Sequence, residues 1–259
     1  MKNLVIAVSP DSSLELLRFF ADVIILDKDL IPDSMKYYDT IYIRSHFSQP
    51  STLPQNFRSE IDSLVQHAKR LNPKIKFIDN MDNVDTIVAF EDKWLQYKTF
   101  GKFMPRTELL NESTDISNFV HPVFKNRLSS RGQGVTWDKE KADASTENWI
   151  IQESCDIAEE LRIYVICGEV YPIGAIRQNK TSKQITQAID SRKLVQDEID
   201  FSANVMCRNS SLDIVGLDIA RTSAGKLSLM EVNRSPGFAK FEQLTGFNLA
   251  SMLYGNTLS

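Results

Sequence analysis

The sequence is poor in cysteine, has no long apolar run and carries no excess of basic charge. Its only cysteines, Cys155, Cys167 and Cys207, lie far apart and form no CxxC pair. This spacing argues against a cysteine zinc site or a redox pair, and an odd number of thiols does not suit a disulfide framework. We therefore expect reduced thiols inside the fold.

No stretch of the chain contains the roughly 18 consecutive apolar residues that indicate a membrane-spanning helix. The amino terminus, MKNLVIAVSPDSS, has an apolar run of five residues that is soon followed by Asp11, and this run is too short for a signal peptide. The sequence therefore predicts a cytoplasmic protein with no membrane partner.

The charged side chains nearly balance, with a formal net charge of -4 over 259 residues. Such a chain lacks the basic surface that binds nucleic acid, so a small molecule or a peptide is the expected partner. The composition is 42% hydrophobic, which is ordinary for a globular protein, and the length suits one large or two modest domains.

The first third alternates short apolar strands with helices, a pattern typical of a parallel sheet covered on both faces. VSPDSS follows the first strand where a dinucleotide-binding domain would carry GxGxxG, so a dinucleotide site is not expected there. We predict an α/β domain over residues 1–88. Its strands are expected at 4–8, 23–26, 40–44 and 76–78, and its helices at 12–21 and 54–71.

The remaining chain, residues 89–259, is richer in strands and is expected to form a second domain with two lobes, about 89–150 and 151–259. A glycine loop joins two strands within 121–137, and a hairpin is expected over 160–178 with its turn near Cys167. Two further strands are expected at 214–222 and 226–233. Helices are expected at 91–100, 195–206 and 238–254.

The strands IVGLDIART (214–222) and KLSLMEVN (226–233) bring together Asp218, Glu231 and Asn233. A two-residue turn at the Ala-Gly pair between the strands would place Asp218 directly opposite Glu231. Strand alternation then puts the three polar residues on one face. The other face, which packs on the core, would hold Leu217, Ile219, Met230 and Val232.

Two carboxylates roughly 5 Å apart repel by about 3 kcal/mol at an effective dielectric near 20, so a positive group is expected between them. The ligands on offer are oxygens from two acids and an amide, which suit magnesium better than zinc. The alternative is that one carboxylate is protonated or pairs with Arg221 or Arg234 on a solvent-facing sheet.

Several side chains are candidates for contact with a nucleotide. The glycine loop SSRGQGV (129–135) lets backbone N–H groups approach phosphates, and Lys125 precedes it with a point charge. Lys93 lies on a polar helix, while Glu153 and Arg177 each close an apolar strand. The alternatives are a plain hairpin turn, a solvated lysine and surface strand ends. Together the candidates contain what phosphoryl transfer requires.

In chain order, DKW (92–94), HPVFKNRLSSRGQGV, IIQES, ELRIYVICGEV, VGLDI, MEVNRSPGF and FEQLTGFNLA resemble the ATP-grasp superfamily, most nearly its RimK-type glutamate ligases. The resemblance covers about residues 85–255. It implies a pre-ATP-grasp, Rossmann-like domain over 1–88 and a two-lobed ATP-grasp domain with antiparallel sheets over 89–259.

The resemblance also implies roles for individual residues, with ATP and Mg²⁺ as cofactors and Mn²⁺ as a substitute. Arg177 would stabilise the acyl phosphate and the tetrahedral intermediate as the catalytic residue. Glu153 would lie near the adenine, and Glu160 would bind the ribose hydroxyls. The metal ligands would be Asp218, Glu231 and Asn233, and the remaining ATP contacts would be Lys93, Lys125, Arg131, Gly132, Gln133 and Gly134.

The implied activity is an ATP-dependent carboxylate–amine ligase that forms an amide through an acyl phosphate. The chain departs from the RimK-type pattern after Arg177, where QNKTSKQITQAIDSR (178–192) replaces an Arg-Ser-Asn run and a Gly-Gly pair. Glutamate is therefore not carried over as the substrate. The 178–192 segment, read as a polar loop with Lys183, and Arg44 are candidates for gripping the acid.

Two other functions stay open at this point. One is a small-molecule kinase of the inositol phosphate type, which would need a basic cleft that the acidic chain does not favour. The other is a non-catalytic nucleotide-binding protein, favoured only by the altered segment after Arg177. Similar enzymes are often dimers or tetramers, so a homo-oligomer is also open.

Overall fold

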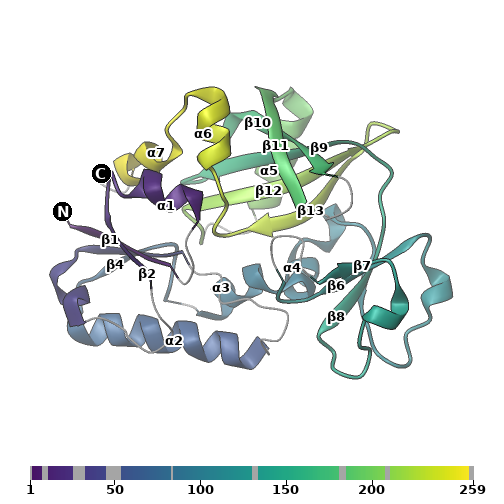
Figure 1. Cartoon of the computed structure of the whole chain (residues 1–259), viewed down its shortest axis with the longest axis horizontal. Coiled ribbons are helices and arrows are strands. Elements are labelled where there is room, and N and C mark those ends of the chain that lie inside the picture. Colours follow the sequence, from purple (N-terminus) through teal and green to yellow (C-terminus); the bar gives the residue numbers. More distant parts are fainter. Residues whose placement is uncertain are drawn as a thin grey trace.

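The computed structural model describes residues 2–7, 11–25, 33–44, 54–82, 84–129, 134–180, 185–207 and 211–256. These residues form one parallel and two antiparallel sheets (Figure 1), as the resemblance implied. No helix in this part of the chain is both long and apolar enough to span a bilayer.

The first sheet is parallel, with strand order β2-β1-β3-β4. Its alternate residues face opposite helices, because successive side chains of a strand point to opposite faces. Leu4 and Ile6 pack with helix α2 (Pro54–Leu71), whereas Val5 and Ala7 pack with α1 (Ser12–Leu17). The strands are β1 (Asn3–Ala7), β2 (Asp22–Ile25), β3 (Thr40–Arg44) and β4 (Lys76–Ile78), and a short 3-10 helix η1 covers Asp33–Tyr37.

The small antiparallel sheet has the order β5-β8-β6-β7 and a core of its own around Phe119, Phe124 and Ile151. Its strands are β5 (Thr107–Leu109), β6 (Pro122–Asn126), β7 (Val135–Thr136) and β8 (Trp149–Glu153). Helices α3 (Val84–Glu91) and α4 (Lys93–Phe100) and the 3-10 turn η2 (Gly101–Phe103) precede this sheet. The 3-10 turns η3 (Ile116–Asn118) and η4 (Lys139–Lys141) lie between its strands. β8 pairs with β5 and β6, so this lobe extends to residue 153.

The large antiparallel sheet has the order β11-β10-β9-β12-β13, with α5 (Gln196–Met206) against one face. The hairpin turn predicted near Cys167 is confirmed, since Cys167 and Gly168 have φ values of 49° and 84°. The prediction of a loop over 178–192 was wrong for residues 178–180 and 185–192, which pair with each other as the ends of β10 and β11, and residues 181–184 lie outside the described ranges. The polar residues of β11 suggested a loop, but a strand at the edge of a sheet can expose polar side chains to solvent. The strands are β9 (Ile157–Ile166), β10 (Glu169–Lys180), β11 (Ile185–Lys193), β12 (Ile214–Thr222) and β13 (Leu227–Asn233).

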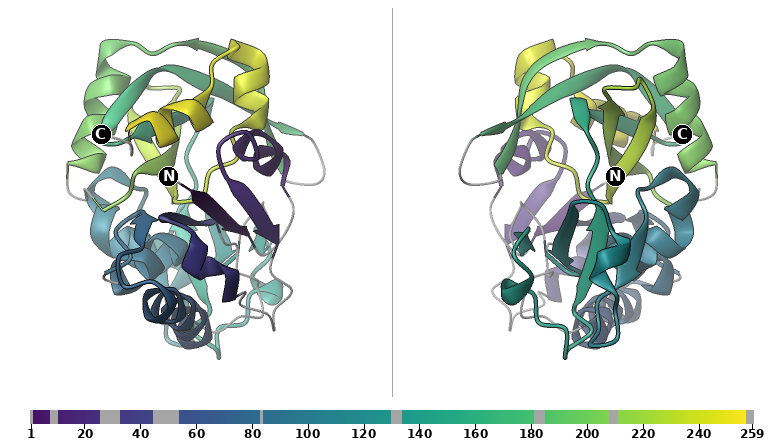
Figure 2. Two further views of the ribbon diagram at one scale, coloured as in Figure 1. Left: turned by 90° about the vertical axis from the view of Figure 1, so that its left-hand side faces the viewer. Right: turned by 90° about the vertical axis from the view of Figure 1, so that its right-hand side faces the viewer.

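The carboxyl-terminal segment forms two helices, α6 (Ala239–Thr245) and α7 (Leu249–Asn256), where one helix was predicted. Gly246 takes the left-handed conformation, with φ 69°, and ends the first helix there. Both helices share a core with α1, through residues such as Leu14, Phe241 and Leu253. Figure 2 shows this contact in two views, with the yellow helices beside purple α1.

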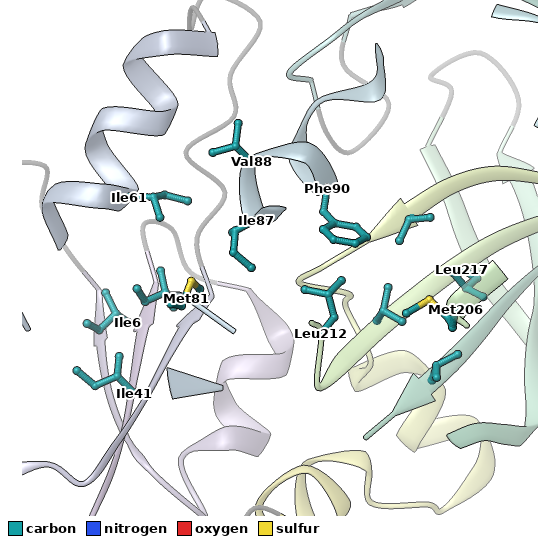
Figure 3. Close-up of a cluster of buried hydrophobic side chains, with 14 of the residues drawn as sticks. Ile6, Ile41, Ile61, Met81, Ile87, Val88, Phe90, Met206, Leu212 and Leu217 are labelled. Atoms are coloured by element: carbon teal, nitrogen blue, oxygen red, sulfur yellow. The ribbon is translucent and has the colours of Figure 1, made fainter. Parts of the chain in front are cut away.

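A continuous apolar cluster joins the first sheet to the large sheet (Figure 3). It runs from Ile6 and Ile41 through Ile87 and Phe90 to Leu217. The division at residue 88 therefore stays a proposal based on sheet topology, because the two parts share this core.

Glu198, on α5, lies in a network of ion pairs that fixes the helix to the large sheet. Its side chain is 0% exposed, and its oxygens lie 2.7 Å from nitrogens of both Arg192 and Arg221. Burial alone would raise the pKa of Glu198, but the two guanidinium groups outweigh burial and lower the pKa to about 2.

Replacing Glu198 with Gln should therefore lower the free energy of unfolding by about 2 kcal/mol at pH 7, because its charge-assisted hydrogen bonds from Arg192 and Arg221 are weakened. Each arginine keeps a second carboxylate, Glu159 for Arg192 and Asp197 for Arg221. The carboxylate's contribution is complete above its ordinary pKa of 4.5 and fades as the pH falls toward about 2. Urea denaturation at pH 7 and pH 3 measures the difference, with the exposed Glu169→Gln as control. A difference that does not shrink at pH 3 contradicts this account.

Candidate active site

The pairing of Asp218 with Glu231 is confirmed. The two residues stand opposite each other on β12 and β13, and Asn233 stands opposite Gly216. On the other side of β12, Asp218 also stands opposite Arg162 of β9. The two carboxylates thus lie side by side on adjacent strands of the large sheet.

The turn that produces this register differs from the prediction. Thr222 N donates to Lys226 O (2.9 Å) and Gly225 has φ 79°, so the loop has three residues instead of two. A bulge then inserts one extra residue into β13, because Ile219 pairs with Leu229. The bulge compensates for the longer loop, and Leu229 takes the core position predicted for Met230.

Two arginines surround Asp218. Arg162 donates from Nε and Nη2 to its two oxygens, both at 2.6 Å, and Arg177 Nη1 lies 2.5 Å from Oδ2. Burial alone would raise the pKa of Asp218, but the attraction of Arg162 and then Arg177 lowers the pKa to about 2. The acid is therefore ionised at neutral pH. The alternative partners lie elsewhere, Arg221 with Asp197 and Glu198 and Arg234 with Asp79 and Glu91.

Arg177 is placed by a bulge between β10 and β11, and it stands opposite Glu160 of β9. Its Nη1 atom lies 2.9 Å from Glu160 Oε1. Burial raises the pKa of the Glu160 carboxyl, and the nearby Asp218 carboxylate adds to the rise. Arg177 is thus held between two acids on the face that carries the Asp218–Glu231 pair.

Two lysines reach the same region from the small lobe. Lys93 opens α4, donates from Nζ to the carbonyl of Ser129 and lies 3.5 Å from Glu231 Oε1. Lys125 on β6 donates to Gln152 Oε1 at 2.7 Å. Burial lowers the pKa of Lys125, and Glu231 opposes that fall. The lysines and the acidic hairpin therefore converge from two lobes.

Glu153 lies apart from this charged cluster. Strand alternation sends its side chain to the face opposite that of Gln152, toward the core of the small lobe. Its Oε1 atom accepts a long bond of 3.5 Å from Val120 N. The predicted adenine contact stays a prediction, as does the ribose contact of Glu160. Four predicted residues lie outside the described part of the chain, namely Arg131, Gly132, Gln133 and Lys183.

Gly134 closes the glycine loop, where its carbonyl accepts from Asn126 N at 2.7 Å. Its φ is 63°, and a Cβ there would lie 2.8 Å from Asn126 Cβ. We expect Gly134→Ala to destabilise the fold by at least about 2 kcal/mol, from left-handed strain plus this clash. Gly225→Ala is a matched control, because Gly225 has φ 79° with nothing within 4 Å. Equal losses of melting temperature for the two variants would refute the steric part.

The prediction that Arg44 grips the substrate is not supported. Its side chain is 1% exposed, Nε pairs with Asp11 at 3.0 Å, and Nη2 donates to the carbonyl of Pro236 at 2.7 Å. Its guanidinium group also lies over the ring of Phe238. The strand end that suggested a ligand site is covered by the loop that follows β13, so Arg44 joins the first sheet to that loop.

The same loop, residues 234–238, shows the structural role of the Arg-Ser-Pro-Gly sequence that follows Glu231 and Asn233. Arg234 is buried against Asp79 and Glu91. The hydroxyl of Tyr164 donates to Gly237 O at 2.7 Å, and Ser13 Oγ accepts from Phe238 N at 2.9 Å. These contacts anchor the end of β13 to β9, to α1 and α3 and to the residue after β4, and so fix where Asn233 stands.

Sequence reasoning missed Arg162 and Gln152 as parts of the site. Arg162 and Gln152 each interrupt an apolar strand with a polar side chain, and that signal was available. Their partners are distant in sequence, at separations of 56 for Arg162 with Asp218 and 27 for Lys125 with Gln152. Strand alternation alone does not identify such partners.

The donor set fits a hard cation. Within the described ranges, no three His, Cys, Asp or Glu side chains gather as a metal-binding group. The candidate ligands on the hairpin are instead two carboxylates and one amide. Asn233 donates from Nδ2 to Asp218 Oδ2 at 3.2 Å, which leaves its carbonyl oxygen as the donor toward a metal. Ionised, oxygen-only ligands suit Mg²⁺ or Mn²⁺.

Comparison with known proteins gives one sequence relative and several similar structures. A probable alpha-L-glutamate ligase of Parasynechococcus marenigrum (strain WH8102) is 29% identical over an alignment 203 residues long, which covers 68% of this chain and 42% of that protein. The chain thus spans less than half the length of this relative.

Two solved structures show the same fold. The D-cycloserine synthetase DcsG has a TM-score of 0.69 at 12% identity, over 98% of this chain and 99% of that one. The ATP-grasp ligase PsnB, complexed with minimal precursor, Mg and ADP, has a TM-score of 0.64 at 13% identity, over 99% and 96%.

A family model described as a RimK-like ATP-grasp domain matches residues 103–255, which contain the acidic hairpin, Lys125 and Arg177. The matched residues contain both antiparallel sheets and the charged cluster apart from Lys93. The chain belongs to the RimK-like ATP-grasp family.

Proposed function

We propose that the protein is an ATP-dependent carboxylate–amine ligase that forms an amide through an acyl phosphate. One observation carries the proposal: Lys93 and Lys125 of one lobe meet Arg177 and the Asp218–Glu231 pair of the other. Lysines for phosphates, acids for a metal and an arginine for developing charge are the parts that phosphoryl transfer requires.

In this proposal Asp218, Glu231 and Asn233 hold Mg²⁺, or Mn²⁺ in its place. The bound ion would neutralise charge on the ATP phosphates. Lys93 and Lys125 supply positive charge from the small lobe, and the glycine loop 131–134 covers the phosphates. Glu153 lies near the adenine and contacts it with main-chain atoms, because its side chain turns toward the core of the small lobe. Glu160 either binds the ribose hydroxyls or holds Arg177 in place. Its ion pair with Arg177 favours the second role.

The reaction has two steps. An oxygen of the acid attacks the γ-phosphorus of ATP, the bond to ADP breaks, and an acyl phosphate results. The amine then attacks the acyl carbon, loses a proton and expels inorganic phosphate, which leaves the amide. In this proposal Arg177 pairs with the transferring phosphoryl group and with the oxyanion of the tetrahedral intermediate.

The acid and amine are proposed only as classes: an amino acid, a small metabolite or a peptide. The relative's name points to glutamate, whereas PsnB was solved with a minimal precursor. The chain's own departure from the RimK-type pattern over residues 178–192, now largely strand β11, argues for a substrate other than the glutamate of that type. Its Lys183 remains a candidate for the carboxylate.

Hydroxylamine trapping tests the proposal. The protein, Mg·ATP and a panel of amino acids and peptides are incubated with hydroxylamine, and acyl hydroxamate and ADP are measured by mass spectrometry. We expect hydroxamate only with the right acid and with ADP in equal amount. ATP consumption by a hydroxyl substrate, with hydroxamate absent throughout, would move the assignment to a small-molecule kinase.

A further inference from the structure

One face of the small sheet carries a row of three polar side chains on three strands: Thr107 on β5, Gln152 on β8 and Lys125 on β6. Thr107 stands directly opposite Gln152. Lys125 stands opposite Ile150, one diagonal step from Gln152 and within reach of a long side chain. Gln152 is 1% exposed and Thr107 is 2% exposed, so the row lies inside the protein.

A chain of hydrogen bonds joins these side chains. Lys125 Nζ donates to Gln152 Oε1 at 2.7 Å, and Gln152 Nε2 donates to Thr107 Oγ1 at 2.8 Å. Thr107 Oγ1 in turn donates to the carbonyl of Pro105 at 3.0 Å. The ammonium group of Lys125 is therefore tied to the main chain through two intermediates.

The chemistry of the end groups fixes the direction of every bond. A carbonyl oxygen can only accept, so Thr107 must give its one hydrogen to Pro105 O. The threonine oxygen can then only accept, which assigns the NH₂ group of Gln152 to the threonine side. The amide oxygen consequently faces Lys125, and an ammonium group can only donate. A flipped amide would point its NH₂ group at the ammonium group and its oxygen at the threonine oxygen, which has no hydrogen left to donate.

We propose that Gln152 is a positioning residue, held in one orientation by Thr107, that fixes the ammonium group of Lys125 for contact with ATP phosphates. The inference rests on the proposed function, because it assigns Lys125 to the phosphates.

Geometry gives the reason such a device is needed. Lys125 comes from β6 of one lobe, and the charged groups that face it come from elsewhere: Glu231 from β13, Glu160 from β9 and Lys93 from α4. A flexible lysine would be drawn toward these acids. A buried acceptor on its own sheet holds it at a defined place at no cost in net charge.

A double-mutant cycle on nucleotide affinity tests the proposal. Dissociation constants for Mg·ADP are measured by calorimetry for the wild type, Gln152→Leu, Lys125→Met and the double variant. We expect Gln152→Leu to weaken binding about tenfold, since a hydrogen bond to a charged group is lost. In the Lys125→Met background the same change should weaken binding by less than about twofold, because no ammonium remains to be placed.

Variants of Thr107 test whether the orientation of the Gln152 amide affects Mg·ADP affinity, which a purely structural role of Gln152 would not predict. Thr107→Val keeps the shape but frees the amide to flip, and should weaken binding about threefold. Thr107→Ser restores the hydroxyl and should rescue affinity. Thr99→Val is the control, because Thr99 Oγ1 donates to Leu95 O at 3.0 Å on α4, outside this row.

The outcomes separate the inference from the function. Equal effects of Gln152→Leu in both backgrounds, or wild-type affinity in Gln152→Leu while Lys125→Met binds weakly, would overturn the positioning role alone. A wild type that does not bind Mg·ADP would overturn the proposed function and the inference with it. Melting temperatures of the folded variants show that affinity is compared between intact proteins.

Discussion

Arg177→Met should reduce the rate of hydroxamate and ADP formation by at least about a thousandfold, while Mg·ADP still binds within a few-fold of the wild type. The arginine lies between Glu160 and Asp218, at 2.9 and 2.5 Å, beside the proposed metal ligands. Its charge is therefore available to the transferring phosphoryl group. Single-turnover assays and calorimetry measure the two quantities.

Arg106→Met is the matched control for Arg177→Met. Arg106 also forms an ion pair with a glutamate, Glu108, but this pair lies at the surface. The control should keep its activity. If Arg177→Met lost nucleotide binding and activity in equal measure, the arginine would be a ground-state binding residue and its proposed catalytic role would be wrong.

The second large effect concerns the metal ligands. Glu231→Gln should weaken Mn²⁺ binding in the presence of ADP at least about tenfold and abolish detectable turnover, because one of two anionic ligands is lost. Glu231 pairs with Lys93 at 3.5 Å and is partly exposed, so its loss should cost little stability. Electron paramagnetic resonance titration of Mn²⁺ and a melting curve report the two effects separately.

Asp218→Asn should differ from Glu231→Gln in one respect. It also removes the partner of the bidentate Arg162, which leaves a buried guanidinium group without its counterion and costs about 3–5 kcal/mol of stability. Two variants with equally weak Mn²⁺ binding but different melting temperatures are expected. Unchanged cellular activity after replacement of Glu231 with alanine would instead favour a non-catalytic protein.

The acidic pair could be predicted from the sequence because strand alternation depends on local spacing alone. The prediction succeeded although its turn was wrong. The loop with Gly225 has one more residue than expected, and the bulge at Met230 adds one extra residue to β13. Beyond the bulge the two changes cancel, so Asp218 still meets Glu231. A bulge depends on tertiary packing and leaves no clear mark in one sequence.

Other features needed the tertiary structure. Arg44 ends a buried strand as a ligand-binding residue would, but the loop after β13 folds back over it. β11 looks like a polar loop because only one of its edges is paired. The counterions of Asp218 were expected to be a metal or nearby arginines, whereas Arg162 lies 56 residues away in sequence. Local patterns fix faces and periods, and partners come from topology.

A crystal structure with Mn²⁺ and a non-hydrolysable ATP analogue tests the central claim most directly. The account predicts one anomalous peak within about 2.2 Å of oxygens from both Asp218 and Glu231, with a phosphate oxygen in the same coordination shell. Analogue bound in the cleft with the manganese elsewhere, and Asp218 engaged only by Arg162 and Arg177, would contradict it.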